Sequence, residues 1–245
     1  MPNSPRCAIS ALGSWPGTGR CGQPKCSRPS RRIAPSTDRA RRRRQGTRVR
    51  DRCVAWQADG HLERHEGQAY RRLQQLVGRP AGDPNGLITA EDLAGIAEPV
   101  AALLLELPQR DIGGQQPSWD DLVAQCAWAR QVGAALHLDG ARLWESAAGY
   151  GRSPAEVAAL FDTVYVSFYK GIGALAGCCL AGPAEIIAEV REWRERMGGM
   201  LIGLWPKAAS ALTCLADRCR GWATTSARRR DRGATARSSR RDCHS

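Results

Sequence analysis

The chain has 245 residues, enough for one large domain or two small ones with a sizeable buried core. Its formal net charge of +12 is uneven, with a net of +12 in residues 1–52, +6 in residues 216–245 and −6 between them. The ten cysteines include no CxxC pair and follow no regular spacing, which argues against structural zinc and against a secreted disulfide framework. We therefore expect an acidic folded region in a reducing cytoplasm.

Residues 1–52 are rich in Pro, Ser and Arg, contain no Glu, and include four consecutive arginines at 41–44. Such a segment buries too little apolar surface to offset the entropy of ordering it, so we expect disorder. A basic nucleic-acid arm, an organelle transit peptide and out-of-frame translation of a GC-rich gene all fit this composition. We do not expect nucleic acid to be the partner, because the excess charge lies outside the folded region. No apolar run approaches ~18 residues, so no membrane span is expected.

In chain order, apolar periodicity and turn residues predict helices that alternate with strands. The predicted helices span Glu66–Leu76, a short segment capped by Thr89 with Asp92, Ser118–Arg130, Ser153–Phe161 and Pro183–Arg196. The predicted strands span Ala101–Leu107, Ala134–Leu138, Thr163–Phe168 and Leu175–Leu180. This alternation predicts the α/β class, with a mostly parallel sheet covered by helices on both faces.

Two residues with useful chemistry follow predicted strands of this sheet. Asp139 comes directly after strand Ala134–Leu138, and Lys170 comes just after strand Thr163–Phe168. In an open α/β sheet, chemistry gathers at the carboxyl ends of the strands. At one rim, the carboxylate can bind a ring nitrogen and the amine can form a Schiff base with an aldehyde. Pyridoxal phosphate requires both of these interactions.

Several motifs around these residues occur in the order and spacing of a known family. They are DGHLERHE (59–66), LELPQRDIGGQ (105–115), HLDGAR (137–142), SFYKG (167–171) and VREWRER (190–196). Over roughly residues 55–210 the chain resembles the threonine aldolase / aromatic amino acid β-eliminating lyase family, pyridoxal phosphate-dependent enzymes of aminotransferase-like fold type I. The resemblance implies a partial large domain at 53–210, with disordered basic segments at 1–52 and 211–245.

The resemblance implies roles for four residues. Lys170 would hold pyridoxal phosphate as a Schiff base, and Asp139 would keep the pyridinium nitrogen protonated. Arg142 would bind the substrate carboxylate with its planar fork, and His61 would stack on the cofactor ring and assist proton transfer. Each has a plainer alternative: a surface lysine, a turn aspartate, an arginine paired with Glu145, and an ordinary loop histidine.

Two competing motifs are weaker. His61 and His65 are spaced like a helical metal pair, but HLERH is not HExxH and no third ligand is evident, so no metal is expected. Gly171–Ala176 fits a loose GxGxxA dinucleotide fingerprint, yet a strand-like run follows it where a helix should begin.

The resemblance implies retro-aldol cleavage of a β-hydroxy-α-amino acid such as threonine to glycine and an aldehyde, by a cytoplasmic homo-oligomer. Such a reaction belongs to threonine breakdown and glycine formation. The sequence shows no counterpart of the family's phosphate-binding segment or of its C-terminal domain. The alternative is therefore a non-catalytic remnant of such an enzyme.

Overall fold

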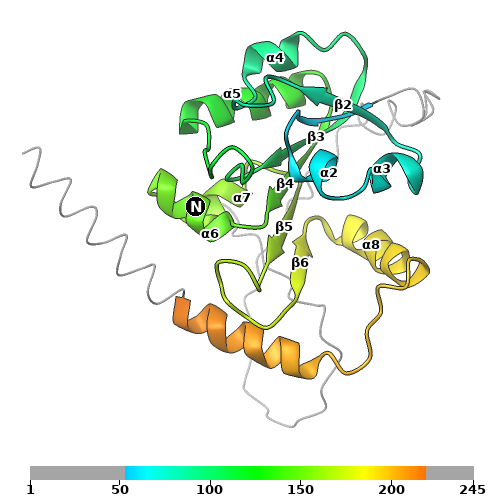
Figure 1. The fold of residues 1–245 in the computed structure, drawn as a ribbon, viewed down its shortest axis with the longest axis vertical. Coiled ribbons are helices and arrows are strands. Elements are labelled where there is room, and N and C mark those ends of the chain that lie inside the picture. The colour runs from blue at the N-terminus through cyan, green and yellow to red at the C-terminus, as the bar shows by residue number, and fades with distance from the viewer. Residues whose placement is uncertain (1–52, 219–245) are drawn as a thin grey trace, which may run out of the picture.

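The computed structural model describes residues 53–218, and its centre is a six-stranded sheet of order β2-β1-β3-β4-β5-β6 (Figure 1). The strands are β1 (Cys53–Gln57), β2 (Val77–Ala81), β3 (Val100–Glu106), β4 (Ala135–Gly140), β5 (Thr163–Ser167) and β6 (Cys178–Ala181). All neighbours from β2 to β5 are parallel, and only β6 runs antiparallel, against β5. The predicted α/β class and mostly parallel sheet are confirmed.

The helices connect these strands. They are α2 (His61–Arg64), α3 (Ala69–Arg72), α4 (Ala90–Ala94), α5 (Trp119–Gln131), α6 (Leu143–Tyr150), α7 (Pro154–Ala158) and α8 (Ala184–Arg196). Residues 205–218 form a further helix, drawn in orange in Figure 1. No helix within residues 53–218 is long and apolar enough to cross a membrane.

Helix starts were the most predictable features of the fold. Thr89 and Ser153 each form a capping box, with Asp92 and Glu156 respectively, and Pro154 occupies the first turn of α7. Ser118 accepts the Asp121 N–H at 3.1 Å and so caps α5. These local hydrogen bonds need only residues three apart, which is why the sequence alone locates them.

Several elements differ from the prediction, among them β1, where no strand was predicted. The helix expected over Glu66–Leu76 shrinks to α3, and β2 begins at Val77, a strand that the apolar pattern did not reveal. β2 is an edge strand that contains Pro80 and buries only Ala81, so it lacks the apolar run of a central strand. The strand expected over Leu175–Leu180 begins only at Cys178, and it too lies at an edge.

The domain boundary predicted after residue 210 falls inside the helix 205–218. Ala211 of this helix is buried with Ile172 and Ala174, in a small cluster apart from the main core. Residues 211–218 are therefore helical, which corrects the prediction of disorder for that part of the tail. A helix that buries one narrow strip has too little apolar character for the sequence pattern to reveal it. The expected disorder of 1–52 and 219–245 lies outside the described residues.

The two faces of the sheet are unequally covered. Leu103, Leu105, Leu136 and Leu138 project from one face and pack with buried residues of α4, α5, α6 and α7. On the opposite face, Trp56 of β1 packs edge-on against Tyr70 of α3, with ring centroids 4.6 Å apart. Farther along that face, β4 carries an exposed Ala135 and the half-buried His137 and Asp139. Helices thus contact both faces, but they cover only one of them continuously.

Candidate functional site

The carboxyl ends of β1, β3, β4 and β5 lie along one edge of the sheet, which we call the carboxyl rim. His61 comes four residues after β1, and Lys170 comes three residues after β5. Asp139 lies within β4, which extends to Gly140, so the prediction that it follows the strand is wrong by two residues. The parallel sheet therefore brings His61, Asp139 and Lys170 to the same rim.

Asp139 is held by its neighbours on both sides. It is in register with Glu106 of β3 and with Tyr165 of β5. Its Oδ1 accepts the Ala141 N–H at 3.1 Å, which fixes the carboxylate at the turn into α6. Within residues 53–218, Oδ2 has no hydrogen-bond partner, so this oxygen is available to a ligand.

The Arg142 segment and the Lys170 segment touch each other. Trp144 in the first turn of α6 lies 6.4 Å from the Phe168 ring, measured between centroids. The carboxylate of Glu145 lies directly against Gly171, where any added Cβ would overlap it. Glu145 is thus in contact with Gly171, and no ion pair joins it to Arg142 within the described part of the chain. The plainer alternative for Arg142 is therefore not what the structure shows.

Lys170 lies in a loop that is anchored from behind. Ile172 and Ala174 are buried against the helix 205–218, and the Gly173 N–H donates to the Lys170 carbonyl at 3.0 Å. The Lys170 side chain is half-buried, with Nζ 5.9 Å from the centroid of the Tyr169 ring. The backbone of Lys170 is therefore held in place after the end of β5.

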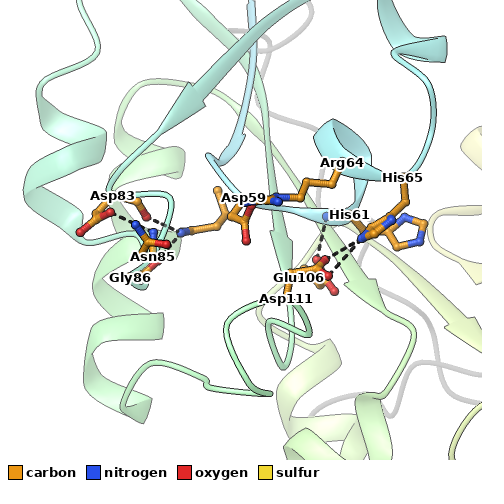
Figure 2. A network of polar contacts seen from close by, with 10 residues as sticks. Asp59, His61, Arg64, His65, Asp83, Asn85, Gly86, Glu106 and Asp111 are labelled. Atoms are coloured by element: carbon orange, nitrogen blue, oxygen red, sulfur yellow. Dashed lines mark hydrogen bonds and ion pairs between the residues drawn. The ribbon is translucent and has the colours of Figure 1, made fainter.

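The two histidines near the rim each face their own carboxylate. His61 Nδ1 lies 3.1 Å from Glu66 Oε1. His65 Nε2 lies 3.0 Å from Asp111 Oδ2 (Figure 2). Their rings are 5.0 Å apart between centroids, and residues 53–218 contain no group of three metal-ligating side chains. Among the described residues, the HLERH histidines therefore have no third side chain with which to bind a metal ion.

Helix α2, which carries His61, is constrained by two contacts, one within its own segment and one to the sheet (Figure 2). The buried Asp59 forms an ion pair with Arg64 within the same segment. The backbone N–H of His61 donates to Glu106 Oε2 at 3.0 Å, which joins α2 to the end of β3. His61 therefore has a defined position relative to the sheet.

The sequence analysis did not identify Glu106 or His137 as site residues. Burial raises the pKa of Glu106, and the charge of Asp139 raises it further. Burial lowers the pKa of His137, whose Nδ1 lies 2.8 Å from Thr163 Oγ1. Both lie on the face of the sheet that carries Asp139. The sequence did contain a signal for each residue. Glu106 is the one acid in the apolar strand VAALLLE and ends it, and His137 alternates with apolar residues in β4.

Comparisons with known proteins identify the family of the chain. The model of the β-eliminating lyase family matches residues 44–238. The aldolase vrtJ of Penicillium aethiopicum is 41% identical over 156 residues, which cover 60% of this chain and 39% of that protein. The low-specificity L-threonine aldolase of Saccharomyces cerevisiae is 29% identical over 146 residues, covering 57% of this chain and 38% of that protein.

A similar solved structure comes from Listeria monocytogenes EGD-E and is provisionally assigned as an L-allo-threonine aldolase. It is 43% identical with a TM-score of 0.69, over 76% of this chain and 50% of that chain. The chain thus spans about two fifths of the length of the curated relatives it matches, as given by the 39% and 38% above. With more than half of its residues matched by the family model, the chain belongs to the β-eliminating lyase family.

Proposed function

We propose that this chain carries part of the active site of a pyridoxal phosphate-dependent lyase of the threonine aldolase type. The substrate class is a β-hydroxy-α-amino acid, and the products are glycine and an aldehyde. The observation that carries the proposal is the meeting of His61, Asp139 and Lys170 at one rim of a parallel sheet. The relatives named above as threonine aldolases support the reaction class.

The residues at the rim fit the cofactor in their chemistry. Lys170 offers a primary amine on an anchored loop, and Asp139 offers a carboxylate with one oxygen free of partners among the described residues. The face of β4 around Asp139 lacks the helical cover of the opposite face, so a flat ring can approach it. When bound, pyridoxal phosphate supplies an electron sink for the electron pair that bond cleavage leaves on the α-carbon.

The protein side of the reaction then divides among four residues. Lys170 would hold the cofactor through its amine, and Asp139 would stabilise the positive charge on the ring nitrogen. Arg142 binds the substrate carboxylate with two parallel hydrogen bonds. His61 accepts the β-hydroxyl proton through Nε2, since its Nδ1 already faces Glu66 at 3.1 Å. Loss of that proton accompanies cleavage of the Cα–Cβ bond, and a proton added to the α-carbon completes glycine.

We also propose a homo-oligomer, on the basis of exposed apolar side chains between α8 and the helix 205–218. Ile202 is fully exposed and Trp205 is 76% exposed, and Met200 and Leu201 beside them are each more than half exposed. An apolar group of this kind is a common feature of subunit interfaces. A cytoplasmic location and a place in threonine breakdown remain predictions from the sequence.

The test uses the full chain with added pyridoxal phosphate. We expect a visible absorbance band from the lysine-bound cofactor, and release of acetaldehyde from L-threonine or L-allo-threonine. K170A should lose both, whereas K207A, a matched change outside the rim, should keep both. Cofactor binding without aldehyde release would limit the chain to a binding remnant, and K170A behaving like wild type would contradict the assignment.

A further inference from the structure

Glu106 occupies the centre of the carboxyl rim. It is the last residue of β3 and is only 5% exposed. It is in register with Asp139 of the neighbouring parallel strand, so the two carboxylates project from the same face of the sheet. A buried carboxylate beside a second carboxylate is energetically costly, since both burial and the like charge oppose its ionisation. Hydrogen bonds to the carboxylate offset part of this cost.

Glu106 accepts hydrogen bonds from two backbone N–H groups. Its Oε2 accepts the His61 N–H at 3.0 Å, and its Oε1 accepts the Arg110 N–H at 3.5 Å. Gly60 precedes α2 and has no side chain that could cap the helix, so the His61 N–H would otherwise lack a partner. The carboxylate of Glu106, 45 residues away in sequence, takes the place of that missing cap.

The other described contacts of α2 lead elsewhere than β3. The Tyr70 hydroxyl donates to Glu63 Oε2 at 3.0 Å, which joins α2 to α3. The Asp59–Arg64 ion pair joins two residues of one short segment, so it stiffens the segment without fixing it to the sheet. The His65–Asp111 contact involves an exposed pair and reaches a loop beyond β3. Glu106 alone joins the His61 backbone directly to the strand that lies beside Asp139.

We propose that Glu106 is a positioning residue that fixes His61 relative to Asp139. This rests on the proposed function, in which His61 and Asp139 act on one ligand. Glu106 need not contact substrate itself, because its effect passes through the His61 backbone. Substitution of Glu106 should therefore release α2 from the rim while the sheet persists.

The charge of Glu106 offers a direct readout of this arrangement. The titratable groups that face it are His61 from α2 and Asp139 from β4, and the Arg110 backbone faces it from the following loop. Burial and the Asp139 charge raise the pKa of Glu106, while the hydrogen bonds from His61 and Arg110 lower it. The His61 amide proton should therefore sense the ionisation of Glu106, and through it the charge of Asp139.

The experiment labels the full chain with 15N-histidine and follows the backbone amides by NMR without cofactor. The sequence has four histidines, so each amide can be assigned by single substitutions. We expect the His61 amide to shift as Glu106 ionises, with a midpoint above the ordinary glutamate value of 4.5. E106Q should abolish this shift and D139N should lower its midpoint, while the exposed-site control E98Q should leave it unchanged.

Two results would overturn the proposal. One is a His61 amide that titrates in E106Q as it does in wild type. The other is a D139N protein with an unchanged midpoint, a result that does not depend on E106Q folding. Because no cofactor is present, failure here is distinct from failure of the proposed function. If the wild-type chain does bind pyridoxal phosphate, E106A, which removes the acceptor of the His61 N–H, should bind it about tenfold more weakly, the effect of about one lost charged hydrogen bond.

Discussion

The two faces of β4 differ sharply in burial and in chemistry. Leu136 and Leu138 point to one face and are 1% and 0% exposed, within the main core. His137 and Asp139 alternate with them, point to the other face and are half-buried. Because side chains alternate along a strand, a single segment can supply stability on one side and chemistry on the other. The two kinds of substitution should therefore have separable effects.

The largest expected effect on stability lies on the covered face. L138A removes a fully buried side chain and leaves a cavity, so it should lower the free energy of unfolding by about 2–5 kcal/mol. Urea denaturation measures this loss. The neighbouring A135S, on the exposed side of the same strand, should change stability by less than about 0.5 kcal/mol. Equal losses for the two variants would remove the distinction between the faces.

Asp139 tests the other face. D139N keeps the size of the side chain and the oxygen that accepts the Ala141 N–H, so stability should change by less than about 1 kcal/mol. Affinity for pyridoxal phosphate should fall by at least about tenfold, because the charge that faces the ring nitrogen is lost. Cofactor absorbance titration and urea denaturation on the same samples compare the two quantities. Unchanged affinity would show that Asp139 does not face the ring nitrogen.

The contact between Glu145 and Gly171 is a third test, at the junction of α6 and the Lys170 loop. A Cβ at position 171 would overlap the Glu145 carboxylate, which is the far end of a flexible side chain and can shift, so G171A should cost no more than about 1 kcal/mol. Removing the carboxylate should relieve the overlap, so G171A in an E145A background should cost clearly less than in wild type. A double-mutant cycle in urea measures the difference, and strict additivity would show that the two residues do not touch in solution.

The smallest effect concerns pH. Burial lowers the pKa of His137, so the unfolded chain binds more protons than the folded chain below pH 6.5. Stability should therefore be fully present above pH 6.5 and should fall as the pH drops through the folded pKa of His137. H137Q removes the titration and should show a shallower loss between pH 6.5 and 5. Identical pH profiles for wild type and H137Q would assign the acid sensitivity to other groups.

Local signals in the sequence located much of this fold. The capping residues Thr89, Ser118 and Ser153 sit where they were predicted, because a cap depends on residues three apart. Asp139 and Lys170 were predicted to lie at one rim because the carboxyl ends of parallel strands share an edge, and they lie at the ends of β4 and β5. The edge strand β2 was missed because an edge buries too little to leave an apolar pattern.

The contacts around the candidate site join residues that are far apart in the sequence, so they could not be predicted from local sequence patterns. Glu106 meets His61 across 45 residues, and only the pairing of β1 with β3 brings them together. Glu145 lies against Gly171 because α6 packs on the loop after β5, which no spacing in the sequence reveals. Sequence patterns thus predicted the candidate reactive residues, whereas the long-range contacts beside them became visible only in the three-dimensional structure.

The most direct test of the proposed site is chemical labelling of the lysines. The chain has three, Lys25, Lys170 and Lys207. Of the two within residues 53–218, Lys170 follows β5 at the carboxyl rim, whereas Lys207 lies in the helix 205–218. The full chain is treated with pyridoxal phosphate, reduced with borohydride and mapped by peptide mass. We predict that Lys170 carries the label well above the other two, and that D139N reduces that preference. Equal labelling of the three lysines would contradict the assignment of this rim as the cofactor site.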